Sequence, residues 1–495
     1  MHKKARGLGA PVVRRRETSA LVLILTAASA LRFLGLGGLP LIGDESYYWL
    51  WSRQPAWSYY DHPAGVALLV RASTAVAGQG HLGIRWLNAL VGTAAVFLAW
   101  LVGRRLLSAR AGLFAAAALA LGAPYVLTSR FVYTNTLPLL FTLLNLLALW
   151  RMTQEHAGPG HGLLFGLSLA LLFNTKYVAY VYALSLAVAV LIDHRSLLGT
   201  RRFWVGAAVG ALGLLPVLLW NLEHDWISFR WQLSHLASSE LGTGGLLSHA
   251  HHAWTYLTAP LVALAGAGLA RVRTRAERLL TTIAVFLLLP VALSPASSPR
   301  NLSLGLVPLL MLAGTRLPAD LSSRARRAAA AAFVTLLLGT AIYGLGTVLR
   351  LHTTAPLPSS SIVPPIRRDA AGWPGLADPL GGGPDPVFTV DYSLAGQVNY
   401  YTKRPAYTHW GQYKVWGIPP LTDATIVSLD YVEEDLVTGR LRQAFDRLEG
   451  PRRIVIRERD STKVVLVWRG WGLLWDQERF LSQLDFLSLL QAADR

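Results

Sequence analysis

The stretch ETSALVLILTAASALRFLGLGGLPLIGDESYY, residues 17–48, joins a long apolar run to a pair of acidic residues. The run 18–37 approaches the ~20 consecutive apolar residues that an α-helix needs to cross a lipid bilayer. Asp44 and Glu45 follow at the point where such a helix would leave the membrane. The stretch therefore predicts a membrane-spanning helix that opens into a charged loop.

Runs of the same kind recur along the first two-thirds of the chain. With the first run, they predict eleven spanning helices near residues 18–37, 84–103, 110–128, 134–150, 161–175, 177–192, 203–220, 253–270, 279–294, 302–317 and 328–349. The fifth and sixth runs are short, and Lys176 separates them. We expect an α-helical polytopic membrane protein.

The composition excludes an ordinary soluble protein. Of the 495 residues, 53% are apolar and only 15% are charged, whereas soluble domains carry roughly 25% charged residues. The 17 Trp, 17 Tyr and 15 Phe exclude low-complexity disorder. Because the chain has no cysteine, disulfides, thiolate metal sites and cysteine nucleophiles are excluded as well.

Arginine-rich segments follow every second span and predict the orientation. Clusters of Lys and Arg lie in the first sixteen residues and near 104–110, 151, 194–202, 271–278 and 316–327. The positive-inside rule places these segments in the cytoplasm, and eleven spans then place the C-terminus outside. The net charge of +18 is therefore a topology signal rather than a nucleic-acid footprint. The N-terminal segment lacks a convincing signal-peptide cleavage site, so we expect a retained anchor.

The remaining segments divide the chain into parts. Outer loops are expected at 38–83 and 221–252 within a transmembrane module of residues 1–352, and a Pro/Gly/Ser-rich linker at 353–386. Residues 387–495 predict a small outer α/β domain, because β-rich runs alternate there with helical patterns. The expected strands are 387–392, 425–430, 453–459 and 463–469, and the expected helices are 394–401 and 432–447.

The first outer loop holds two acidic clusters. A solvated loop or a helix N-cap would explain Asp44 and Glu45 alone equally well. The segment SYYDHPAG, residues 58–65, adds Asp61 and His62, and the proline after His62 favours an extended backbone there. Aromatic residues surround both clusters: Trp49, Trp51, Trp57, Tyr59 and Tyr60. This combination favours a binding site, and the amphipathic run 64–77 predicts a helix along the membrane surface.

This pattern resembles the GT-C polytopic membrane glycosyltransferases, in particular the protein O-mannosyltransferase-like and lipid A aminoarabinose transferase-like families. The resemblance continues in NTKYVAY at 174–180 and PVLLWNLEHDWISFRWQ at 216–232. It implies transfer of a sugar from a polyprenyl-phosphate donor to a glycolipid, polysaccharide or protein acceptor at the outer membrane surface. The predicted topology and the excess of arginine over lysine are compatible with a bacterial inner membrane.

Two positions depart from the family pattern. Ala64 stands where a second proline usually follows, and Asn135 stands where an Asp is common, which leaves a role of that Asp in metal or acceptor binding in doubt. We expect no metal site, although the sequence leaves a divalent cation as an alternative. The histidines His249, His251 and His252 lack the spacing of zinc ligands.

The chemistry that the resemblance implies needs a base more than an acid. A polyprenyl phosphate leaves as an anion, so the main requirement is a carboxylate that deprotonates the acceptor. We assign this role to Asp44, with Glu45 supporting it and Asp61 positioning a cation or a sugar hydroxyl. A single base with direct displacement predicts inversion at the anomeric carbon.

Cations must also stabilise the departing phosphate. The candidates are His62, Arg130, Lys176 and Arg300. Snorkelling toward an interface would explain Lys176 equally well, and interfacial anchoring would explain the arginines. The candidates for binding the sugar or the acceptor are Tyr60, Asn135, Asn221, His224 and Asp225.

Two other classes of function are compatible with a polytopic protein: a transporter or lipid flippase of the cell envelope, and a non-catalytic assembly protein. Transporters place ionisable residues near the bilayer midplane, in pairs of broken helices. Here the acids gather in outer loops and no inverted pair of broken spans is visible in the sequence. These features favour the enzyme.

Overall fold

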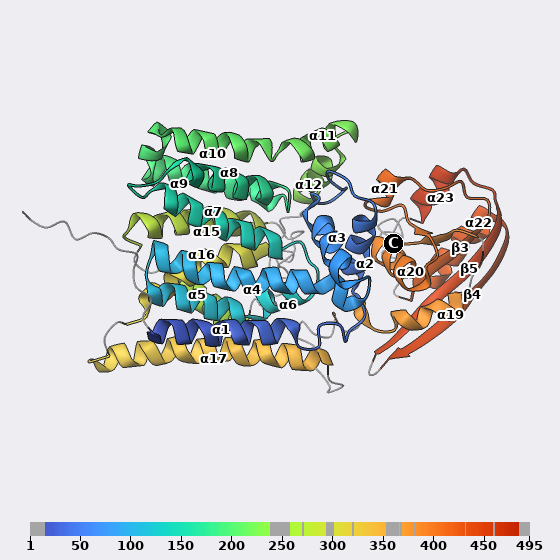
Figure 1. Ribbon diagram of the computed structural model, residues 1–495. Coiled ribbons are helices and arrows are strands. Elements are labelled where there is room, and N and C mark those ends of the chain that lie inside the picture. Colours follow the sequence, from blue (N-terminus) through green and yellow to red (C-terminus); the bar gives the residue numbers. More distant parts are fainter. Residues whose placement is uncertain are drawn as a thin grey trace, which may run out of the picture.

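A computed structural model describes residues 15–237, 258–269, 272–293, 301–318, 321–352, 366, 369–380, 383, 385–430, 432–458 and 461–484. A bundle of long helices makes up most of the molecule, and a smaller sheet domain lies against one end of it (Figure 1). The bundle contains α1 (Arg15–Phe33), α4 (His81–Leu106), α5 (Ala109–Leu121), α6 (Ala123–Arg130), α7 (Thr136–Met152), α8 (Pro159–Phe173), α9 (Val178–Asp193), α10 (Arg201–Leu212), α11 (Leu215–Glu223), α14 (Ala259–Gly268), α15 (Arg275–Leu293), α16 (Leu302–Arg316) and α17 (Arg324–His352), with the short 3-10 helix η1 (Arg195–Gly199). Three further helices, α2 (Gly43–Arg53), α3 (Gly65–Ala77) and α12 (Ile227–Ala237), lie at the end that faces the sheet domain.

Helices occupy all of the predicted spans. The span expected at 110–128 is the pair α5 and α6, bent by 59°, and the span expected at 203–220 is α10 followed by α11. In the described part of the chain, three helical segments are long and apolar enough to cross a membrane, His81–Leu106, Arg201–Glu223 and Arg324–His352, or four with the bent pair. Because other apolar helices are shorter, the count of eleven crossings stays a prediction.

The arginine-rich helix ends meet at the end of the bundle opposite to the sheet domain (Figure 1). Ion pairs join Arg104 to Glu17 at 2.8 Å, Arg278 to Asp193 at 2.5 Å and Arg316 to Glu277 at 3.1 Å. Each pair connects helices that are distant in sequence. The alternation of arginine-rich and acidic loops thus corresponds to two opposite ends of one bundle.

The bend between α5 and α6 is stabilised by the buried side chain of Arg32. Its guanidinium donates hydrogen bonds to the carbonyl oxygens of Leu119 (3.0 Å) and Ala120 (3.2 Å), at the end of α5. These carbonyls have no helical partner beyond the bend, and an unsatisfied carbonyl in an apolar interior is costly. By bonding these carbonyls, Arg32 lowers the free-energy cost of the bend between α5 and α6.

The sheet domain has five strands in the order β2-β1-β3-β5-β4. The strands are β1 (Val387–Thr389), β2 (Ala406–Tyr407), β3 (Ala424–Leu429), β4 (Phe445–Glu458) and β5 (Ser461–Leu473); β1 is parallel to β2 and β3, and β5 is antiparallel to β3 and β4. The helices are η3 (Trp373–Leu376), α19 (Ala377–Leu380), α20 (Tyr392–Thr402), α21 (Tyr413–Trp416), α22 (Glu434–Ala444) and α23 (Gln477–Gln483). One face of the sheet packs on η3, α19 and α20, and the other packs on α22 and α23.

Two details of this domain differ from the sequence expectation. The helix expected at 432–447 ends at Ala444, because Phe445 begins β4 and packs against Phe480, with 5.4 Å between the ring centroids. Residues 369–380, assigned to the linker, include η3 and α19, whose Trp373 and Leu376 are buried in the domain core. An early segment of the domain thus lies within the stretch whose composition suggested a linker.

The sheet domain is docked tightly on α2. Tyr401 Oη accepts a hydrogen bond from the Leu41 amide at 2.7 Å, and Gln397 Nε2 donates to the Leu41 carbonyl at 2.8 Å. A Cβ atom at Gly43 would lie 2.4 Å from Ser393 Cβ, so only glycine permits this approach of α2 to α20. The domain and the first loop also share one hydrophobic core. The first outer loop is therefore held between the bundle and the sheet domain.

Candidate active site

The acidic pair at the start of α2 separates into two environments. Consecutive residues on a helix point about 100° apart, which follows from 3.6 residues per turn. Glu45 is fully buried, and its carboxylate binds Arg85 of α4 through Nε (2.8 Å) and Nη2 (2.5 Å). It also accepts hydrogen bonds from the amides of Ile42 (3.1 Å) and Val132 (3.0 Å). Glu45 therefore supports its neighbour by fixing the start of α2.

Asp44, in contrast, is half-buried and faces the sheet domain. Tyr392 Oη donates a hydrogen bond to Asp44 Oδ1 at 3.2 Å. The carboxylate of Asp369 accepts hydrogen bonds from the neighbouring Gly43 amide at 3.3 and 3.2 Å. Burial and the charge of Asp44 raise the pKa of Asp369 to about 7. The carboxylate of Asp44 thus lies where the sheet domain meets α2.

Asp61 and His62 lie on a tight turn. The Tyr59 amide donates to the His62 carbonyl at 3.0 Å, and an antiparallel bridge joins Ser58 to Pro63. Tyr47 Oη donates to Asp61 Oδ1 at 3.4 Å. Burial, with the charge of Asp44 next, raises the pKa of Asp61 to about 7. Asp61 therefore belongs to the same acidic group as Asp44.

His62 belongs to the opposite, cationic side of the turn. Burial and the charge of Lys176 lower the pKa of His62 to about 3, so its imidazole is neutral at physiological pH. Its Nδ1 atom is buried and has no hydrogen-bond partner among the residues that the structure describes. A buried nitrogen of this kind is a candidate ligand contact.

Lys176 sits at the break between α8 and α9. Its Nζ donates to Asn301 Oδ1 at 2.7 Å and to Asn135 Oδ1 at 3.2 Å. The same break is joined to the first loop, because the Gly65 amide donates to the Asn174 carbonyl at 2.7 Å. Two side-chain amide oxygens thus hold the ammonium in place. Asn135, at the position where the sequence resemblance leads us to expect an Asp, therefore accepts a hydrogen bond from the Lys176 ammonium.

Arg130 makes structural contacts at the start of the first loop. Arg130 Nη1 donates to the carbonyls of Leu31 (2.8 Å) and Leu34 (2.9 Å), and Nη2 lies 3.0 Å from His352 Nε2. These contacts anchor the turn after α1, and the assignment of Arg130 to the phosphate stays a prediction. Arg300 lies outside the described residues, as do the histidines His249, His251 and His252.

The segment after α11 is structural for most of its length. Asn221 is fully buried; its Nδ2 donates to the Val217 carbonyl (2.9 Å) and its Oδ1 accepts from the Ser228 amide (3.2 Å). His224 stacks on Trp220 with ring centroids 4.1 Å apart, and Asp225 is exposed. Its φ of 52° places Asp225 in the left-handed region. The predicted roles of Asn221, His224 and Asp225 in substrate binding are not supported by these contacts.

Tyr60 is buried beside the site, where its amide donates to Gln412 Oε1 at 2.7 Å. Several residues that the sequence reasoning did not assign also meet here, namely Tyr47, Asn301, Asp369, Tyr392 and Gln412. Three of them, Asp369, Tyr392 and Gln412, belong to the sheet domain. Only the fold could reveal them.

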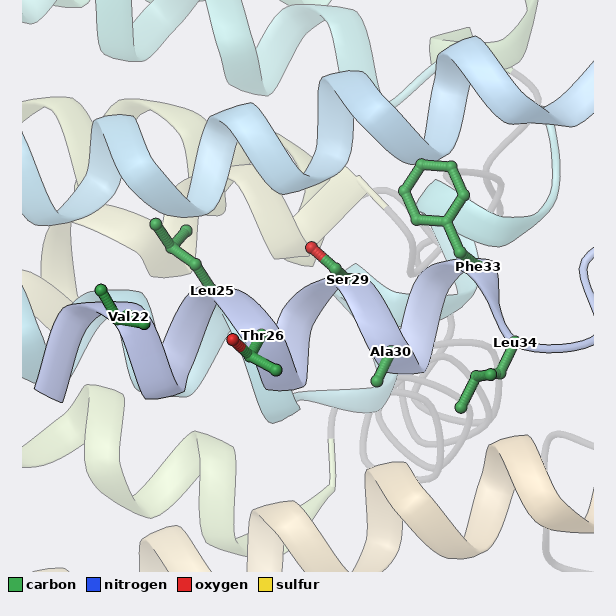
Figure 2. Close-up of a pocket in the computed structure, with 7 residues that line it drawn as sticks. All are labelled: Val22, Leu25, Thr26, Ser29, Ala30, Phe33 and Leu34. Atoms are coloured by element: carbon green, nitrogen blue, oxygen red, sulfur yellow. The ribbon is translucent and has the colours of Figure 1, made fainter. Parts of the chain in front are cut away.

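Neither a cluster of metal ligands nor the groove found along α1 marks this site in the part of the chain that the structure describes. In the described ranges, no group of three or more His, Asp or Glu is arranged to hold a metal ion. A groove of about 660 Å³ runs along α1 and is lined by Val22, Leu25, Thr26, Ser29, Ala30, Phe33 and Leu34 (Figure 2). None of these side chains is ionisable, so we place the candidate site by its chemistry, at the turn of Asp61 and His62.

Comparisons with known proteins show what the whole chain is similar to. A family model described as dolichyl-phosphate-mannose-protein mannosyltransferase matches residues 61–220. The solved structure of ArnT from Cupriavidus metallidurans, with undecaprenyl phosphate bound, covers 91% of this chain and 98% of its own, with a TM-score of 0.57 and 18% identity. At this identity the similarity shows that the chain has the fold of that structure over most of its length.

Two curated proteins are similar to this chain over part of their length. A lipid A galacturonosyltransferase of Rhizobium johnstonii is 31% identical over 200 residues, which are 40% of this chain and 42% of the relative. An undecaprenyl phosphate-alpha-4-amino-4-deoxy-L-arabinose arabinosyl transferase of Pseudomonas fluorescens is 29% identical over 250 residues, 45% of this chain and 42% of the relative. The matched segments thus span less than half of either relative.

We expect Glu45→Gln to lower the free energy of unfolding by about 3–5 kcal/mol, because the buried Arg85 charge would lose its partner. Thermal unfolding of the purified protein in detergent measures this loss. Asp44→Asn is the matched control, since the Asp44 carboxylate is only half-buried. Equal stability of the wild type and Glu45→Gln would contradict the structural role of Glu45.

The raised pKa of Asp61 predicts a pH dependence of stability. A carboxyl group with a pKa of about 7 when folded and about 4 when unfolded binds its proton more tightly in the folded state. The folded protein therefore loses stability as pH rises from about 4 to about 7. We expect Asp61→Asn to reduce the fall in Tm between about pH 5 and about pH 8, because it removes this ionisation.

Some of that fall should remain in Asp61→Asn, because Asp369 has a similarly raised pKa. Asp446→Asn, which changes an exposed carboxylate, should keep the wild-type profile. A fall in Tm that is the same in Asp61→Asn and in the wild type would show that Asp61 ionises normally.

Proposed function

We propose that this protein is an inverting glycosyltransferase that moves a sugar from a polyprenyl-phosphate donor to an acceptor of the cell envelope, on the outer face of a bacterial inner membrane. The observation that carries the proposal is the turn of Asp61 and His62. One of these neighbours interacts electrostatically with Asp44, and the other with Lys176. A base and a phosphate-binding cation therefore flank the same turn.

The reaction follows from these positions. Asp44 accepts the proton of an acceptor hydroxyl or amine, whose oxygen or nitrogen forms a bond to the anomeric carbon. The bond between that carbon and the donor phosphate breaks, and the phosphate leaves as an anion. Lys176 Nζ and His62 stabilise this anion, and the attack from the opposite face inverts the configuration. Tyr392 orients the Asp44 carboxylate through its hydrogen bond.

The comparisons support the donor class. The two curated relatives transfer galacturonic acid and 4-amino-4-deoxy-L-arabinose according to their names, and the similar ArnT structure holds undecaprenyl phosphate. A glycolipid of the lipid A type is the acceptor that these relatives suggest, and a polysaccharide or a protein is the alternative. The arginine-rich end of the bundle would then face the cytoplasm, with the sheet domain in the periplasm.

A transporter or flippase is the less favoured function. The bent pair α5 and α6 is similar to the broken helices of transporters. However, the carbonyls of Leu119 and Ala120 at the bend accept hydrogen bonds from Arg32, so they are not available to bind a substrate. The acidic groups lie at the end of the bundle, under the sheet domain. This arrangement favours chemistry at the membrane surface.

Asp44→Asn should reduce sugar transfer about 10²–10⁴-fold, because the amide cannot accept the acceptor's proton. The measurement is transfer of a radiolabelled sugar from its undecaprenyl-phosphate donor to lipid A in proteoliposomes, with galacturonic acid and aminoarabinose donors compared. Asp225→Asn is the control, since Asp225 is exposed and asparagine tolerates its left-handed backbone. Full activity of Asp44→Asn would remove the assigned base.

Lys176→Ala should weaken binding of undecaprenyl phosphate about 10- to 100-fold, the usual effect of losing a hydrogen bond to a charged group. Binding of the labelled lipid phosphate to the purified protein measures the change. Lys414→Ala, at an exposed lysine of the sheet domain, should bind as the wild type does. An unchanged affinity of Lys176→Ala would move the phosphate site elsewhere.

A further inference from the structure

Four aromatic residues from three separate segments form a continuous series beside the acidic group. The ring centroids of Tyr60 and Trp231 are 5.3 Å apart, those of Trp231 and Trp410 are 5.7 Å apart, and those of Trp410 and Tyr392 are 6.4 Å apart. Tyr60 belongs to the first outer loop, Trp231 to α12, and the other two to the sheet domain. We call these residues the aromatic series.

One end of the aromatic series is bonded to the carboxylate of Asp44, and the other end adjoins the main chain of Asp61. At one end, Tyr392 donates its hydrogen bond to Asp44. At the other end, Tyr60 directly precedes Asp61, and Gln232, next to Trp231, donates to the Asp61 carbonyl at 3.0 Å. The series therefore lies alongside Asp44 and Asp61 on the side of the sheet domain. Lys176 lies on the bundle side of the same turn and interacts with His62. Its ammonium donates to Asn135 and Asn301.

The two tryptophans differ from the core tryptophans of this protein. Trp51 and Trp468 are fully buried, with no exposed area, in the hydrophobic cores of the first loop and of the sheet domain. Trp231 and Trp410 are only half-buried, although they stand where two parts of the molecule meet. Partial exposure is common for tryptophan, so the position of these two rings carries the argument. Both belong to the aromatic series beside Asp44 and Asp61, which places indole faces next to carboxylates.

A sugar ring fits this chemistry. Its C–H face packs on an indole, and its hydroxyl or amino groups bind carboxylates, so apolar walls with a few polar groups recognise it. We infer that Trp231 and Trp410 form the subsite for the sugar headgroup of the acceptor, an inference that rests on the proposed function. The acceptor sugar lies against these rings, so that its nucleophilic hydroxyl reaches Asp44, while the donor phosphate lies on the Lys176 side. The sheet domain therefore takes part in acceptor selection.

The test uses the full-length protein in proteoliposomes, with lipid A as acceptor and the undecaprenyl-phosphate-linked sugar that the wild type transfers. Trp410→Ala should raise the KM for lipid A about three- to ten-fold, the loss expected for one aromatic contact, and leave the KM for the donor unchanged. Trp410→Phe should recover most of the affinity. Trp231→Ala, on a different element, should repeat the effect if Trp410→Ala does not fold.

Trp471→Ala is the matched control. Trp471 is a half-buried tryptophan of the same domain, and its ring contacts the guanidiniums of Arg447 and Arg469, at 4.9 and 4.8 Å from its centroid. This variant should keep the wild-type KM for lipid A. An unchanged acceptor KM in both Trp410→Ala and Trp231→Ala would overturn the inference, and a rise in the donor KM alone would assign the rings to the donor sugar instead.

A binding measurement separates this inference from the proposed function. The soluble β-1,6-linked glucosamine disaccharide, the sugar core of lipid A, should bind the wild type in saturation-transfer NMR and bind Trp410→Ala more weakly. Weakened binding without any sugar transfer by the wild type would retain the sugar subsite and reject the transferase. Transfer with unaltered disaccharide binding in Trp410→Ala would reject the subsite alone.

Discussion

The buried ion pair between Glu45 and Arg85 is the interaction on which the rest of the site depends. Both side chains are almost completely shielded from solvent, and two hydrogen bonds of 2.8 and 2.5 Å join them. Arg85 also donates to the carbonyls of Leu36 (3.1 Å) and Leu39 (2.8 Å), in the chain that enters α2. Burial of charge is tolerable only with such complete pairing. By holding Glu45 inward, the pair turns Asp44 toward the sheet domain.

Three buried arginines bind main-chain carbonyls, whereas Lys176 binds side-chain amides. Arg32, Arg85 and Arg130 direct their guanidiniums at main-chain carbonyls near the outer ends of the helices. These hydrogen bonds stabilise turns whose carbonyls an apolar environment would otherwise leave unpaired. The ammonium of Lys176 instead donates to the side-chain oxygens of Asn135 and Asn301. Under the proposed function, this contrast assigns the phosphate to Lys176 rather than to the three arginines.

The sheet domain completes the site rather than covering it. Tyr392 reaches Asp44, Gln412 holds the Tyr60 segment, and the Gln412 amide donates to Tyr47 Oη at 2.6 Å. Since Tyr47 in turn donates to Asp61, the position of that carboxylate depends on the domain. A change of the domain would therefore alter the orientation of the acids as well as the acceptor surface.

The sequence by itself determined the helical segments, the two kinds of loop and the first loop as the place of the acids. These properties depend on residues that are close in sequence: hydropathy over about 20 residues, arginine clusters, and the spacing of Asp44 and Asp61. Four of the five strands of the sheet domain were predicted in part for the same reason. The short strand β2 was not predicted, and the helix end at Ala444 and the early start of β4 depended on the packing of Phe445.

Only the tertiary structure decided which charges have partners. Glu45 and Arg85 are 40 residues apart, Lys176 and Asn301 are 125 apart, and Tyr392 and Asp44 are 348 apart. Sequence alone could not separate Arg130, which binds carbonyls, from Lys176, because both are basic residues at the ends of apolar runs. The physical reason is that the use of a buried charge is set by the direction of its side chain and by the groups that face it, and packing between distant segments determines both.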